Sequence, residues 1–147
     1  MLFSQGFQDI DATAVEELCR IQYPETDVVE YKQYVPGKMG PDRWHEGAKK
    51  ISEYARDELL SHLVAFANTR GGHLFVGIEE SSDQPKRAVA PCLVPGCQEL
   101  ADRVRQAAFS CIEPPLDDLQ VRGIPMDPDG KGIVLFRVGE SRNSIEP

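Results

Sequence analysis

Acidic and basic side chains are unevenly distributed near the N-terminal end of this 147-residue sequence. Residues 1–31 contain seven acids against the single base Arg20, whereas residues 32–56 contain six bases against three acids. Carboxylates that lie close together bind divalent cations, and a neighbouring run of Lys and Arg attracts phosphates. The pattern suits a metal site beside a nucleic-acid path, although solvated charge on both segments is the commoner origin of such runs. The six bases are Lys32, Lys38, Arg43, Lys49, Lys50 and Arg56.

The composition is that of an ordinary globular protein, with 41% hydrophobic and 27% charged residues. The net charge of −8 counts against a simple basic clamp for nucleic acid. No apolar run approaches the roughly 20 residues of a membrane-spanning helix, and no signal-peptide pattern opens the sequence. We therefore expect a cytoplasmic protein with reduced thiols at its four cysteines.

The periodicity of apolar residues predicts the elements that position these charges. The helical pattern is strongest over 56–68. Gly71 and Gly72, shortly after it, end the helix. A continuous apolar strand follows at once, and the last two strands form a hairpin around Asp127-Pro-Asp-Gly130. The predicted helices span 12–21, 56–68 and 98–111; the predicted strands span 27–34, 73–78, 87–90, 119–124 and 133–138, with a loop over 36–44.

This order predicts an α+β fold, β-α-β-(β)-α-β-β, with strands 73–78 and 133–138 central and both long helices on one face of the sheet. Residues 1–22 form a helical segment that precedes a domain over 23–147. The sequence ends at Ser144-Ile-Glu-Pro147 without a capping element, so we expect the N-terminal part of a longer protein.

Three segments, in this order and spacing, resemble the Schlafen/AlbA-like domain family. They are Val29-Glu30-Tyr31-Lys32, the AFANTRGG stretch over 65–72, and the LFVGIEE stretch over 74–80. The resemblance implies a fold like that of the chromatin protein Alba. Some members of the family are metal-dependent endoribonucleases acting on transfer and ribosomal RNA, and others are domains of proteins described as transcriptional regulators.

The resemblance also implies a site. Glu25 and Glu30 match two glutamates that the nuclease members use, and Glu80 stands where these generally have aspartate. The implied cofactor is Mg²⁺ or Mn²⁺. Lys32 would hold a phosphate or the leaving oxygen of the reaction; equally, it would form a salt bridge with Glu30. Because a spacing of five places Glu25 and Glu30 on opposite faces of one strand, Glu25 must fold back after Pro24.

The basic loop, residues 36–50, is the predicted nucleic-acid contact, through Lys38, Arg43, Lys49 and Lys50. Trp44 and Tyr34 either stack on bases there or fold under the loop. RNA is the expected partner rather than DNA, and without G-x4-GK[ST] an ATP site has no support. Three functions remain open: a metal-dependent endoribonuclease, a non-catalytic DNA- or RNA-binding or regulatory domain, and a self-association module that forms a homodimer.

Overall fold

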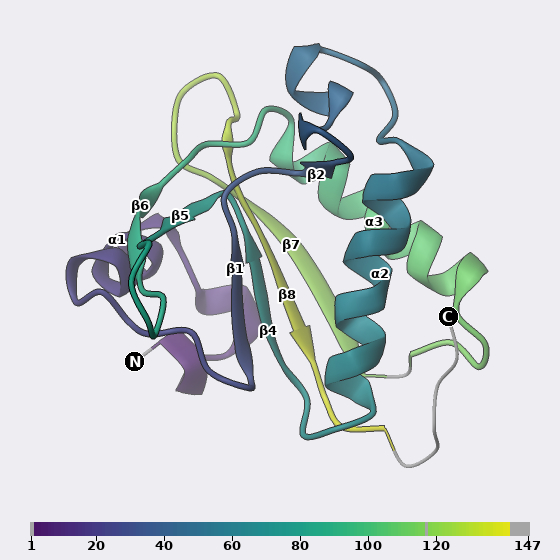
Figure 1. Cartoon of the computed structure of the whole chain (residues 1–147), viewed down its shortest axis with the longest axis horizontal. Coiled ribbons are helices and arrows are strands. Elements are labelled where there is room, and N and C mark those ends of the chain that lie inside the picture. Colours follow the sequence, from purple (N-terminus) through teal and green to yellow (C-terminus); the bar gives the residue numbers. More distant parts are fainter. Residues whose placement is uncertain (1, 117, 142–147) are drawn as a thin grey trace.

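The computed structural model describes residues 2–116 and 118–141, which form three α-helices, three 3-10 helices and eight strands (Figure 1). The predicted chain end at residues 144–147 lies outside the described residues. The helices are η1 (Leu2–Ser4), η2 (Phe7–Asp9), α1 (Ala12–Arg20), η3 (Arg43–Glu46), α2 (Glu53–Ala67) and α3 (Cys97–Cys111). The strands are β1 (Val29–Lys32), β2 (Pro36–Gly37), β3 (Gly40–Pro41), β4 (Gly72–Val76), β5 (Ile78–Glu80), β6 (Ala88–Pro91), β7 (Leu119–Pro125) and β8 (Gly132–Val138).

The main sheet is mixed, with the strand order β1-β4-β8-β7. Strand β1 runs parallel to β4, whereas β4–β8 and β7–β8 are antiparallel pairs. The predicted α+β class, the terminal hairpin and the two central strands are confirmed. Leu74, Val76 and Leu135 are fully buried, as strands covered on both faces require.

Helices α2 and α3 cover one face of the sheet, as predicted (Figure 1). Helix α2 begins earlier than the apolar stripe indicated, because Ser52 caps it by accepting a hydrogen bond from the Ala55 N–H. Helix α3 presents Leu100 and Val104 to the sheet. Cys111, the last residue of α3, is exposed.

The other face of the sheet is covered by the N-terminal segment, residues 2–20, and by the ribbon β5–β6. Asp11 caps α1 by accepting a hydrogen bond from the Ala14 N–H. Two arginines of the β7–β8 hairpin reach this segment: Arg122 donates to the backbone oxygen of Phe7 at 2.6 Å, and Arg137 donates to that of Gln5 at 3.0 Å. Residues 2–20 therefore share a core with the sheet.

The apolar run over 73–78 is not one strand, which corrects the prediction. Gly77 separates β4 from β5 with a φ of +110°, a conformation that side chains other than glycine rarely adopt. A Cβ there would also lie 3.2 Å from the carbonyl oxygen of Cys92. The chain leaves the sheet at this point, and β5 pairs with β6 in a separate ribbon.

The segment predicted as an irregular loop, residues 36–44, contains the small ribbon β2–β3 and the start of η3. Asp42 organises it from a buried position, with 3% of its surface exposed. Its carboxylate accepts hydrogen bonds from the Trp44 N–H and from the backbone N–H and hydroxyl of Ser52. The start of η3 and the N-terminal cap of α2 are thus held by one side chain.

Candidate active site and nucleic-acid interface

Glu25 and Glu30 face each other across a tight turn that precedes β1. Thr26 and Val29 form an antiparallel bridge and exchange two backbone hydrogen bonds, with N···O distances of 3.1 and 3.4 Å. The next residues outward, Glu25 and Glu30, are therefore a cross-strand pair without mutual backbone hydrogen bonds, the kind in which side chains lie closest. Glu25 folds back after Pro24, and the separation of five residues follows from the turn.

Strand alternation sets the direction of Glu30. Its neighbours Val29 and Tyr31 are buried against the N-terminal segment, so Glu30 and Lys32 lie on the opposite face of β1. Glu30 is level with Leu74 and Lys32 with Val76 on the adjacent strand β4.

Glu80 reaches the same place from the other direction. After the bend at Gly77, the last residue of β5 is Glu80, and Glu79 before it is exposed. The register of the β5–β6 pair shifts between Glu79 and Glu80. The side chain of Glu80 then lies close enough to that of Glu25 for each carboxyl group to shift the pKa of the other. Of the two adjacent glutamates, Glu80 is the one whose side chain lies beside that of Glu25.

The contacts of Glu25 define a cluster of three carboxylates, Glu25, Glu30 and Glu80, which we call the glutamate cluster. Burial raises the pKa of Glu25, and the charge of Glu30 raises it further. Burial also raises the pKa of Glu80, in the direction that the charge of Glu25 favours. Because both causes disfavour the ionised form, a proton or another cation in the cluster lowers its energy.

Lys86 supplies a positive charge to the glutamate cluster. Its ammonium group lies 3.2 Å from Oε1 of Glu80 and lowers the pKa of that carboxyl. The pKa of Lys86 is raised, first by its hydrogen bond to Glu80 and also by the charges of Glu25 and Glu30. Sequence reasoning missed Lys86, because its proximity depends on the β5–β6 turn, which no motif indicated.

Lys32, the base that the sequence favoured, lies on the side of α2. Its charge lowers the pKa of His62, a residue of α2, after the larger effect of burial. The charges that act on Glu80 are those of Lys86 and Glu25. The catalytic role of Lys32 stays a prediction.

The donor chemistry of the glutamate cluster suits a hard divalent cation, since carboxylate oxygens are the ligands that Mg²⁺ and Mn²⁺ prefer. Oε2 of Glu80 is buried and has no hydrogen-bond partner within the described part of the chain. The arrangement itself is not a finished cage. Among residues 2–116 and 118–141, no group of three or more His, Cys, Asp and Glu side chains is placed so that it could hold a metal ion. Glu25 lies beside both Glu30 and Glu80 instead, and Lys86 is paired with Glu80.

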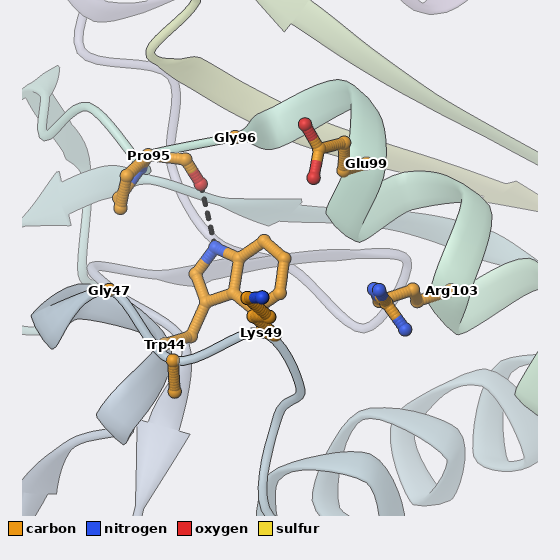
Figure 2. A pocket seen from close by; sticks show the side chains of 8 residues that line it. Trp44, Gly47, Lys49, Pro95, Gly96, Glu99 and Arg103 are labelled. Carbon is orange, nitrogen blue, oxygen red and sulfur yellow. Dashed lines mark hydrogen bonds between the residues drawn. The ribbon is translucent and has the colours of Figure 1, made fainter.

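The four predicted nucleic-acid-binding bases are all exposed, and three of them border two hollows in the surface. Lys38 and Arg43 line a hollow of about 480 Å³ between the β2–β3 ribbon and the start of α2. Lys49 lines a second hollow of about 320 Å³, together with Glu99 and Arg103 of α3. Figure 2 shows Lys49 in front of the Trp44 indole, with Arg103 on the facing helix. Arg103 was not among the predicted bases.

Trp44 folds under the basic loop and does not present a face for stacking. Only 5% of its surface is exposed, and its indole N–H donates to the carbonyl oxygen of Pro95 at 2.6 Å (Figure 2). This bond ties η3 to the turn before α3. Tyr34 is half-buried and packs edge-on against His45. Of the two alternatives for Trp44, the structure shows the packing role.

Fold and site together define an α+β domain with a carboxylate cluster at one edge of a mixed sheet and a cation-bearing loop on its helical side. The sequence matches the family described as Schlafen, AlbA_2 over residues 25–146, and the chain belongs to this family. It is therefore a nucleic-acid-related domain. In the part of the chain that the structure describes, no helix is long and apolar enough to cross a membrane.

Proposed function

We propose that this domain is a metal-dependent endoribonuclease that acts on structured RNA, with Glu25, Glu30 and Glu80 as ligands of Mg²⁺ or Mn²⁺. The observation that carries the proposal is the meeting of three carboxylates from a turn, a strand of the sheet and the separate ribbon β5. Like charges brought together in this way reduce stability unless a cation joins them. We include the Alba-like topology in this proposal.

Each residue of the cluster has a definable part in the reaction. The Glu25–Glu30 pair presents carboxylate oxygens from one side, and Glu80 adds one from β5. A divalent cation bound there would supply charge stabilisation at the scissile phosphate and orientation of a water molecule. Lys32 lies two residues beyond Glu30, on the same face of β1, and is available to a neighbouring phosphate.

The basic loop supports the nucleic-acid part of the proposal. Exposed cations at Lys38, Arg43, Lys49 and Lys50 provide sites for backbone phosphates, whose neutralisation supplies much of the binding free energy. The preference for RNA over DNA comes from the nuclease members of the family and belongs to the proposal. A strongly acidic remainder of the surface would keep this contact local to the loop.

Glu30→Gln tests the catalytic part, because it keeps the volume of the side chain and removes the charge that a metal requires. We expect loss of Mn²⁺-dependent cleavage of a structured RNA, measured by gel on an end-labelled hairpin, with folding intact by circular dichroism. Glu79→Gln is the matched control, since Glu79 is exposed and precedes Glu80 on the same strand. Cleavage that survives Glu30→Gln contradicts the proposal.

Charge reversal in the loop tests the binding part. Lys49→Glu should weaken RNA binding and flatten its salt dependence, with the slope of log K against log salt reduced by about one to two charges. Lys131→Glu, in the exposed turn between β7 and β8, is the control for the same change of net charge. Equal effects of the two substitutions in fluorescence anisotropy titrations would remove the loop from the interface.

A second candidate function has its own supporting observation. Glu25 lies beside Glu30 and Glu80, but within the described part of the chain no three such side chains are placed so that they could hold a metal ion. This favours a non-catalytic DNA- or RNA-binding or regulatory domain, in which the cluster is structural and self-association into a homodimer is one use of the surface. RNA or DNA binding that is retained in Glu30→Gln, without cleavage by either protein, would select this candidate.

A further inference from the structure

Lys86 is attached to two members of the glutamate cluster at once. Its backbone carbonyl oxygen accepts a hydrogen bond from the Glu25 N–H at 2.7 Å, and its ammonium group contacts Oε1 of Glu80 at 3.2 Å. One residue thus connects the turn before β1 to the end of β5. The main chain of Lys86 is fixed on one side of the cluster and its charge on the other.

The backbone around Lys86 is held independently of this ion pair. Ser81 N–H donates to the Arg87 carbonyl oxygen at 2.9 Å, and the Arg87 N–H donates to the Ser81 hydroxyl at 2.9 Å. Arg87 also forms an antiparallel bridge with Pro24. The position of the Lys86 Cα therefore does not depend on its ammonium group, and substitution of the side chain leaves these bonds in place.

The side chain of Lys86, by contrast, is able to move away from Glu80 into solvent. Lys86 has 39% of its side-chain surface exposed against 24% for Glu80. A lysine side chain is a flexible four-carbon stem with a strongly hydrated charge, so it regains water when it swings outward. Oε2 of Glu80, by contrast, is buried away from water and has no hydrogen-bond partner in the described structure.

We propose that Lys86 is the built-in counter-cation of the glutamate cluster, and that a divalent cation binds there in competition with its ammonium group. The second half rests on the proposed function. One ammonium group satisfies Oε1 of Glu80 and leaves Oε2 unpaired. Two cations so close repel each other, so metal binding frees Oε1 by moving Lys86 into water. Lys86 thereby sets the metal concentration at which the site fills.

If Lys86 instead positions Glu80 for the metal, its substitution should change metal affinity in the opposite direction. In that reading Lys86 holds the Glu80 carboxylate in the orientation that a metal needs, and its removal weakens metal binding. In ours, removal of the charge tightens metal binding while it destabilises the protein in the absence of metal. Lys86→Gln separates the two, because the amide can still hydrogen-bond to Glu80 but carries no charge.

The first arm measures thermal unfolding of the full chain in EDTA. Lys86→Gln should lower the midpoint by about 2–4 °C, the shift expected when a protein of this length loses one partly exposed ion pair. Lys86→Arg should restore it in part, and Lys131→Gln is the control for loss of a lysine elsewhere. In the background of Glu80→Gln the effect of Lys86→Gln should largely disappear, because the paired charge is already gone. An undiminished effect in that background overturns the counter-cation.

The second arm measures Mn²⁺ binding by electron paramagnetic resonance of the free ion. Lys86→Gln should tighten binding about tenfold, which is about 1.4 kcal/mol, with Lys131→Gln unchanged. Weaker or unaltered binding in Lys86→Gln overturns the competition. If Mn²⁺ binds neither protein at millimolar concentration, the proposed metal site and the competition both fail, and the first arm alone decides whether Lys86 is the counter-cation.

Discussion

Glu25→Gln isolates the electrostatic strain on which the proposed site depends. Glu25 contacts both Glu30 and Glu80, and burial together with the charge of Glu30 raises its pKa. Glutamine has nearly the same shape as glutamate and keeps one side-chain oxygen. This oxygen can still accept a hydrogen bond from the backbone N–H of Tyr31, the group that lowers the pKa of Glu25. The substitution therefore removes a charge and leaves the packing of the turn almost unchanged.

The expected gain follows from the geometry. Two unit charges about 5 Å apart repel by about 3 kcal/mol at an effective dielectric constant near 20. Lys86 offsets part of this repulsion, and Glu25 and Glu30 are only half-buried, so water screens the rest. For partly exposed charges the measured contribution is about 1 kcal/mol. We expect Glu25→Gln to stabilise the protein by about 1 kcal/mol at pH 7.5 in EDTA, or about 2–4 °C.

Urea denaturation followed by circular dichroism measures this gain, and Glu79→Gln is the matched control. Glu79 lies beside Glu80 on β5 but is exposed, so its substitution should change stability by less than about 0.5 kcal/mol. With millimolar Mn²⁺ the order should invert, because the wild-type protein gains stability from the bound ion and Glu25→Gln does not. A loss of stability in EDTA for Glu25→Gln would refute the idea that repulsion dominates at this turn.

Three further substitutions test the scaffold. Gly77→Ala should cost about 2 kcal/mol and weaken Mn²⁺ binding through β5, whereas Gly130→Ala, also at positive φ but in open space, should affect stability alone. His73 accepts a hydrogen bond from Arg137, and burial lowers its pKa to about 4, so the unfolded chain takes up a proton first on acidification. The protein should therefore lose about 2 kcal/mol of stability as the pH falls from 6.5 toward 4, after allowance for the partial exposure of His73. Denaturation curves across that pH range should show this loss for the wild type and not for His73→Gln. Asp42→Ala should cost about 3 kcal/mol in the same assay, because one buried and two half-buried donors lose their buried acceptor; a cost below about 1 kcal/mol would contradict its role in holding η3 to α2.

The sequence predicted the sheet better than it predicted the path of the chain after β4. Continuous apolar runs identify buried strands well, and residues 73–76 and 133–138 are central as expected. The same continuity concealed the bend at Gly77, since Ile78 is as apolar as Val76 and is equally buried. A lone glycine in an apolar run signals either a bend or a close approach, and only tertiary packing decides between them.

Lys86 shows why part of the site escaped prediction. Its contact with Glu80 depends on a hairpin whose register shifts at Glu79, and its contact with Glu25 depends on a backbone bond between segments 61 residues apart in sequence. Neither is encoded in local periodicity or in a short motif. Long-range polar contacts of this kind follow from the whole fold, so a prediction from spacing alone attributed the local cation to Lys32.

The spacing of Glu25 and Glu30 carries more information than a strand pattern allows. On one continuous strand, residues five apart lie on opposite faces, which argues against a shared site. A two-residue turn at Asp27-Val28 reverses that conclusion, because the residues outside the bridge between Thr26 and Val29 face each other on one side. The cluster then requires two further features, the bend at Gly77 and the register shift before Glu80. Three separate departures from regular structure bring like charges together, and all three carboxylates lie outside the buried core. A concentration of like charge at one place is typical of a site that binds a cation, and it is the physical reason for proposing the function there.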